Sequence, residues 1–158
     1  MSDRARELLE LFYLPEMIYL REGVEYSVEK KSVRGYFHIP GSHTYSCQPL
    51  GYVTGSQYLM CLSQLAYILL GYLVRDKTAD FDFVDFKTFK RLMTECKMWF
   101  REIRRLRFLK NVQKDTEFEL TLTLKKVSTP RGFAVCILEI GGVARDELEF
   151  VAPLNNKG

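Results

Sequence analysis

The chain has 158 residues, 47% hydrophobic and 13% aromatic, which fits one globular domain with a buried core. A formal net charge of +3 is too small to indicate nucleic-acid binding, and the four cysteines form no CxxC pair, which argues against a zinc site or a disulfide framework. We therefore expect a reduced, cytoplasmic protein with no metal, no cofactor, no nucleic-acid partner and no membrane contact.

The N-terminal segment is expected to be helical. It carries acidic residues within its apolar stretch and has no small-residue cleavage site, so it does not resemble a signal peptide. From Asp3 to Phe12 the leucines recur at helical spacing, and Pro15 follows. This pattern predicts a short amphipathic helix that ends before Pro15 and packs on the edge of a sheet.

A hairpin is expected next. Two β-rich stretches, Val24–Val28 and Val33–Ile39, lie on either side of Lys30 and Lys31. A loop with two glycines and Pro49 then leads to a long apolar segment.

That segment predicts a buried helix from about Gly55 to Tyr72. The run Thr54-Gly55-Ser56-Gln57 is a capping-box pattern at its start. The stretch from Tyr58 to Val74 is near the lower length limit of a membrane span and contains polar residues, so we expect it to be buried in protein.

The second half of the chain predicts one more helix and then strands. A mixed apolar and charged pattern favours an amphipathic helix from about Asp85 to Glu95. Strands are expected over Lys97–Leu109, Glu117–Val127, Phe133–Ile140 and Val143–Val151. This order predicts an α+β domain in which an antiparallel sheet wraps around the apolar helix and buries it on every side. Another α+β fold with an apolar helix is the alternative.

Two short stretches carry a family resemblance. Gly51-Tyr52-Val53-Thr54-Gly55 and Ser63-Gln64-Leu65-Ala66-Tyr67 resemble the FcoT-like fatty acyl-CoA thioesterases, and the likeness runs from about Glu25 to Leu154. The resemblance implies a hotdog fold: an antiparallel sheet around a long central helix, here with an extra N-terminal helix. We expect a single domain over residues 1–158, with a helical extension at 1–22 and the hotdog core at 23–154.

The resemblance also implies a function. It predicts hydrolysis of a fatty acyl thioester, carried on coenzyme A or an acyl carrier protein, by a homodimer or higher homo-oligomer with an acyl tunnel where the central helix meets its partner. The family's loop tyrosine matches Tyr45, whereas its helix-start asparagine and glutamate fall on Thr54 and Gln57. These departures leave two alternatives open: a dehydratase or hydratase-like enzyme acting at the 3-position of the acyl chain, and a non-catalytic acyl-thioester binder.

The residues themselves suggest where chemistry takes place. Backbone N–H groups of Gly55 and Ser56 at a helix start would polarise a thioester carbonyl, or the same residues would only cap the helix. No carboxylate lies between Lys30 and Arg75, so the titratable candidates of this segment are its two histidines. We expect His38 to be a plain sheet residue and His43 to be either catalytic or a surface residue.

Five further residues are candidates for substrate binding. Gln64, a buried amide, would brace the loop carrying Tyr45 or face the substrate. Met60 and Tyr67 fit either a core or an acyl tunnel, and a dehydratase's usual glutamate would fall on Met60. Arg104 and Arg107 belong to a basic run that would contact coenzyme A phosphates or an acidic carrier protein, or would only be solvated.

Overall fold

The computed structural model describes residues 3–21, 23–43, 50–103 and 106–154. The helices are α1 (Asp3–Leu9), α2 (Gly55–Arg75) and α3 (Phe86–Thr94), with short 3-10 turns η1 (Pro15–Met17), η2 (Ala79–Phe81) and η3 (Pro130–Gly132). The strands are β1 (Glu25–Ser27), β2 (Ser32–His38), β3 (Trp99–Ile103), β4 (Arg107–Phe108), β5 (Glu117–Ser128), β6 (Phe133–Gly142) and β7 (Ala144–Pro153).

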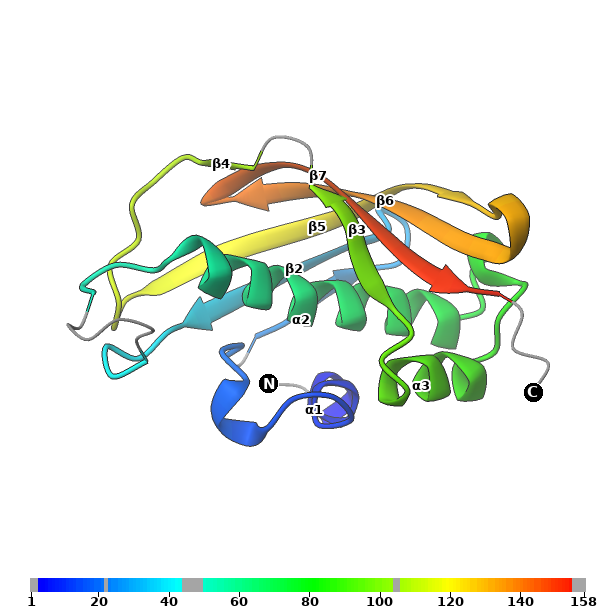
Figure 1. Ribbon diagram of the computed structural model, residues 1–158, viewed down its shortest axis with the longest axis horizontal. Helices are drawn as coiled ribbons and strands as arrows, with labels where there is room; N and C mark the ends of the chain where they lie inside the picture. Colours follow the sequence, from blue (N-terminus) through cyan, green and yellow to red (C-terminus); the bar gives the residue numbers. More distant parts are fainter. Residues whose placement is uncertain (1–2, 22, 44–49, 104–105, 155–158) are drawn as a thin grey trace.

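The strands form one antiparallel sheet in the order β1-β2-β5-β6-β7-β3. The short strand β4 pairs with the first residues of β7, whereas β3 pairs with its second half. The sheet curves over α2, and β3 crosses in front of the helix (Figure 1). Along β5, buried apolar residues alternate with more exposed ones, so one face of the sheet packs on the helix. The expected α+β architecture, with one sheet around one long helix, is confirmed.

Helix α2 begins where the capping box predicts. Thr54 Oγ1 accepts a hydrogen bond from the Gln57 N–H at 3.5 Å, and Gln57 Oε1 accepts one from the Thr54 N–H at 2.9 Å. The helix ends at Arg75, three residues later than expected. Within the described residues it is the one helix long and apolar enough to cross a membrane, yet 78% of its apolar window is buried in the protein. Its apolar surface is thus explained by burial.

The N-terminal helix lies elsewhere than expected. Helix α1 packs on α2 from the side opposite the sheet, with α3 beside it, rather than on the sheet edge (Figure 1). A Cβ atom on Gly71 of α2 would lie 2.7 Å from Leu8 Cδ1 and 3.1 Å from Phe89 Cε1. The expectation that the sheet buries the helix on every side is therefore wrong: the sheet covers one side of α2 and two helices cover the other, because a curved sheet covers only the face turned toward it.

The strand predictions are confirmed with one correction. The hairpin of β1 and β2 forms, as do the last three strands. The stretch Lys97–Leu109 is not one strand: β3 and β4 pair separately with β7, and the register shifts between Phe100 and Glu102. A bulge of this kind places two residues opposite one and bends the edge of the sheet.

Candidate functional site

The start of α2 is an exposed set of hydrogen-bond donors. Gly55 and Ser56 are both exposed, while the first helical bond runs from the Tyr58 N–H to the Thr54 carbonyl at 3.0 Å. Among the described residues, none accepts a hydrogen bond from the N–H of Gly55 or Ser56. Such orphan N–H groups, at the positive end of a 21-residue helix, are suited to hold an oxygen on which negative charge develops.

His43 is fastened to this first turn. The side chain of Gln57, which is fully buried, donates from Nε2 to the His43 carbonyl oxygen at 2.9 Å. The Lys114 ammonium donates to the same oxygen. The structure therefore brings together the loop histidine and the helix start, two features that the sequence analysis placed in one site.

The imidazole of His43 faces a buried tyrosine. His43 Nδ1 lies 3.1 Å from the Tyr19 hydroxyl, and the two rings meet edge to face with centroids 5.5 Å apart. No described residue hydrogen-bonds Nε2. When Nδ1–H donates to the Tyr19 oxygen, Nε2 carries the free lone pair and can take a proton from water.

Gln64 binds a different segment from the one expected. It is fully buried, donates from Nε2 to the Met17 carbonyl at 2.7 Å and accepts from the Tyr19 N–H at 3.1 Å. The amide that holds the loop before the helix is Gln57 instead. Among the described residues, the hydrogen bonds of the Gln64 amide go to this N-terminal segment. It fixes the backbone of Tyr19, the residue that contacts His43.

Met60 and Tyr67 occupy the same face of α2 but differ in exposure. Met60 is half-buried, whereas Tyr67 is 2% exposed and its hydroxyl donates to the Met98 carbonyl at 3.2 Å. Burial raises the pKa of Tyr67, so its phenol stays neutral. Tyr67 is a core residue of the single chain.

The remaining candidates lie at the rim of the site or outside the described residues. Arg107 is exposed in β4, and the next residue, Phe108, packs on Tyr58 with ring centroids 4.5 Å apart. Strand β4 therefore lies beside the first turns of α2. Tyr45 and Arg104 fall outside the described residues. The other histidine, His38, accepts a hydrogen bond from Arg21 at 2.9 Å on its strand, as expected of a sheet residue.

Three residues of this region were missed by the sequence analysis: Tyr19, Lys114 and Asp115. Asp115 accepts from the Gly41 N–H at 2.9 Å and donates its own N–H to the Ile39 carbonyl at 3.0 Å. The Asp115 carboxylate thus contacts Gly41, which is two residues before His43 in the loop. The segment between Lys30 and Arg75 contains no carboxylate of its own. Because these partners are far apart in sequence, no local pattern signals them.

No group of three or more His, Cys, Asp or Glu side chains that could hold a metal ion occurs in the described part of the chain.

Burial also raises the pKa of two tyrosines on or near α2, Tyr13 and Tyr58, each to about 12. The phenols of Tyr13 and Tyr58 therefore stay protonated at neutral pH.

Solved structures match this architecture. A candidate thioesterase related to phenylacetic acid degradation, from Ralstonia eutropha, matches with a TM-score of 0.56 and 14% identity over 94% of this chain and 98% of its own. The fold is a hotdog fold. The dehydratase heterocomplex ApeI:P from Xenorhabdus doucetiae matches with a TM-score of 0.55 and 12% identity, over 93% of this chain and 90% of its own.

A variant of an acyl-CoA hydrolase from Staphylococcus aureus matches with a TM-score of 0.51 and 12% identity, over 84% of this chain and 72% of its own. No protein-family model matches the sequence, and no curated protein sequence matches it. At these identities the likeness shows the hotdog fold alone, and it does not bear on the FcoT-like subfamily.

Proposed function

We propose that this protein hydrolyses a fatty acyl thioester at the first turn of α2. The observation that carries the proposal is the hydrogen bond from the Gln57 side chain to the His43 carbonyl, which attaches the backbone of the loop histidine to the turn where Gly55 and Ser56 are exposed. Hotdog structures include a candidate thioesterase and an acyl-CoA hydrolase, and this supports the same reaction class here.

The reaction follows from the placement of these groups. The thioester carbonyl oxygen accepts hydrogen bonds from the Gly55 and Ser56 N–H groups, which stabilise the charge that develops during attack. His43 Nε2 takes a proton from the attacking water and returns it to the departing thiolate. The products are a free fatty acid and a free thiol. Thr54 and Gln57 hold the turn, and Tyr45 would help position the water.

The carrier half of the substrate would lie toward β4. Arg107 is exposed beside the helix start, and we assign it, together with Arg104, to the phosphates of coenzyme A or to an acidic carrier protein. A second subunit would complete the acyl site, since a stripe of α2 stays open in the single chain.

Release of free thiol from a panel of acyl-CoA and acyl-carrier thioesters tests the proposal. We expect His43→Ala to lower kcat by about 10²–10⁴-fold, the usual contribution of a positioned general base. His38→Ala removes the chain's other histidine and should leave kcat within about twofold of wild type, because His38 bonds Arg21 on the sheet. Wild-type thiol release in His43→Ala would contradict the assignment.

The same experiment separates the other two functions. Tight binding of an acyl thioester without thiol release would indicate a non-catalytic binder. Conversion of a 3-hydroxyacyl thioester to the 2-enoyl thioester, lost in His43→Ala, would indicate a dehydratase with His43 as its base. Either result would replace hydrolysis as the function of this site.

A further inference from the structure

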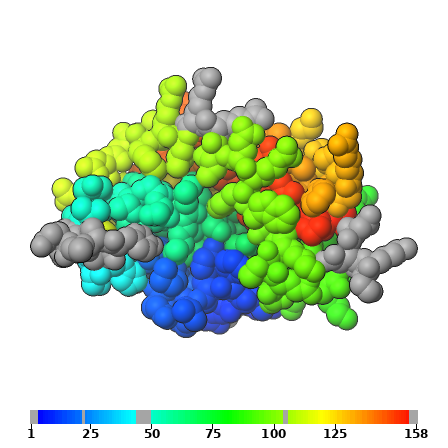
Figure 2. Space-filling view, viewed as in Figure 1, coloured from blue at the N-terminus to red at the C-terminus, as the bar shows by residue number. Residues whose placement is uncertain are grey.

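One face of α2 forms an open strip that leads away from the candidate site. Ser56, Met60, Ser63 and Tyr67 recur at positions i, i+4, i+7 and i+11, so they lie in one line along the helix. Ser56 is exposed, and Met60 and Ser63 are half-buried. In Figure 2 the teal surface of the first half of α2 is exposed between the blue N-terminal segment and the yellow-green segment that contains β4. We call this surface the α2 strip.

The α2 strip ends at Tyr67. The rings of Phe12 and Tyr13 lie over Tyr67, with centroid distances of 5.2 Å and 6.3 Å, and the Tyr13 hydroxyl donates to Ser63 Oγ at 2.7 Å. The N-terminal segment therefore closes the strip, and Gln64 fastens that segment to the same helix. From Ser56 to Tyr67 the helix rises about 16 Å, the extended length of an acyl chain of about a dozen carbons.

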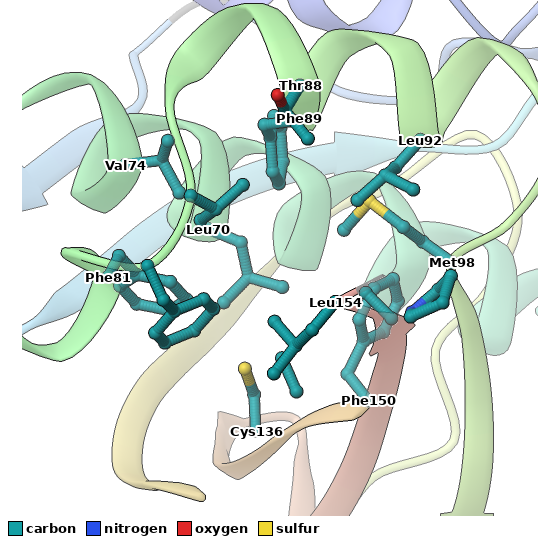
Figure 3. A pocket seen from close by; sticks show the side chains of 15 residues that line it. Leu70, Val74, Phe81, Thr88, Phe89, Leu92, Met98, Cys136, Phe150 and Leu154 are labelled. Carbon is teal, nitrogen blue, oxygen red and sulfur yellow. The ribbon is translucent and has the colours of Figure 1, made fainter. Parts of the chain in front are cut away.

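An apolar, partly open space lies beyond Tyr67 on the same helix face. Leu70 and Val74 continue the line and border a cavity of about 40 Å³ between α2, α3 and the ends of β6 and β7. In Figure 3 the side chains of Leu70, Phe81 and Met98 converge on this space, with Cys136 and Phe150 beneath it. Among the lining residues, the side chains of Thr88, Met98 and Cys136 are those that carry an oxygen or a sulfur, so the mostly hydrocarbon lining suits an alkyl group.

Tyr67 lies between the α2 strip and two of the residues that border the cavity. Its hydroxyl donates to the carbonyl of Met98, and its ring meets that of Phe150 edge to face at 5.5 Å. Both partners border the cavity, and the rings of Phe12 and Tyr13 also contact Tyr67. Tyr67 is thus the residue of α2 that contacts both the N-terminal segment and the lining of the cavity.

We propose that Tyr67 sets the acyl-chain length of the substrate by ending the α2 strip and separating it from the apolar cavity. The inference rests on the proposed thioester site and deepens it: the substrate class is a straight, medium-length acyl chain whose methyl end stops at Tyr67 and the Phe12 and Tyr13 rings that contact it. The cavity is the space that longer chains enter once the ring is gone.

The test compares kcat/KM across a series of acyl-CoA thioesters from butyryl to stearoyl. We expect wild type to peak near lauroyl-CoA and Tyr67→Ala to raise the palmitoyl-to-lauroyl ratio by about tenfold or more, since each newly buried methylene favours binding. Tyr67→Phe keeps the ring and should keep the wild-type profile. Tyr67→Leu is the second variant if the alanine variant fails to fold.

Two controls make the result specific. Tyr72→Ala removes the same side chain from the same helix, but this ring packs on Tyr26 and not on the cavity, so its chain-length profile should match wild type. Adding Ala134→Leu to Tyr67→Ala fills the cavity and should return the peak to shorter chains.

The outcomes for the two proposals differ. Thioester hydrolysis with an unchanged chain-length profile in both Tyr67→Ala and Tyr67→Leu would overturn the role of Tyr67 and leave the hydrolase intact. If wild type hydrolyses none of the thioesters, the hydrolase proposal fails, and the chain-length dependence of Tm on added fatty acids then tests Tyr67 alone. In that measurement, identical wild-type and Tyr67→Ala profiles would overturn the length assignment.

Discussion

Two buried glutamines on α2 act at different places. Gln57 holds the carbonyl of His43 and closes the capping box, whereas Gln64 joins α2 to the Met17–Tyr19 backbone. A buried amide needs partners for its oxygen and its nitrogen, and here each amide finds them on a segment that precedes the helix. Gln57 thereby fixes the backbone of His43, and Gln64 fixes the backbone of Tyr19, whose hydroxyl contacts His43.

Gln64→Leu is expected to destabilise the protein. The change leaves the Met17 carbonyl and the Tyr19 N–H without their buried partner, at a cost of about 1–3 kcal/mol for each group. Urea unfolding should show this as a lower midpoint with an unchanged m-value. Ser63→Ala, next to it on the helix, removes only the bond from the Tyr13 hydroxyl and should cost less. An equal loss in both variants would contradict the bracing role of Gln64.

At the scale of elements, the contact between α1 and α2 depends on a missing side chain. Gly71 allows Leu8 to approach the helix backbone, because any Cβ there would meet Leu8 Cδ1 at 2.7 Å. Without α1 and α3, the apolar residues on the side of α2 opposite the sheet would be exposed to water.

Gly71→Val should therefore lower the free energy of unfolding by about 1–3 kcal/mol through overpacking. Leu8→Ala alone should cost about 2–5 kcal/mol, because it leaves a cavity in the core. In the double variant the valine fills part of that cavity, so the combined loss should be smaller than the sum. Denaturant melts of all four proteins measure this coupling. Strict additivity would show that the two residues do not share the same space.

The elements that the sequence predicts are those set by local chemistry. The capping box placed the start of α2, and the β-rich stretches placed β5, β6 and β7 to within two residues at each end. What the sequence could not supply depends on tertiary contacts: the position of α1, the break between β3 and β4, and the approach of Lys114 and Asp115 to the His43 loop. The partner of Gln64 was missed for the same reason.

At the scale of the whole molecule, β3 is the last strand of the sheet, and within the described residues no strand pairs with its outer edge. The neighbouring α2 strip is also uncovered in one chain. An open strand edge beside a partly exposed helix face is a surface that proteins normally cover. A second copy of this chain would cover both.

Sedimentation equilibrium at micromolar concentration should therefore give at least twice the 18.5 kDa mass of one chain. Met60→Glu places a charge on the α2 strip and should shift the protein toward monomer without unfolding it, since Met60 is only half-buried in the single chain. Val28→Glu, at an exposed apolar position on the β1–β2 turn, is the matched control and should leave the mass unchanged. A monomeric wild type would contradict this prediction.

The placement of α2 in the chain has a consequence for how the protein is made. Helix α2, the most apolar helix, leaves the ribosome before the strands that cover it, β5, β6 and β7, have been synthesised. Strand β2 cannot complete its pairing until β5 has been made, because Val33 pairs with Leu122. Such long-range pairing slows folding and leaves apolar surface exposed in the nascent chain. During translation the protein is thus most open to aggregation between the synthesis of α2 and that of β7, a period in which binding by a chaperone would protect it.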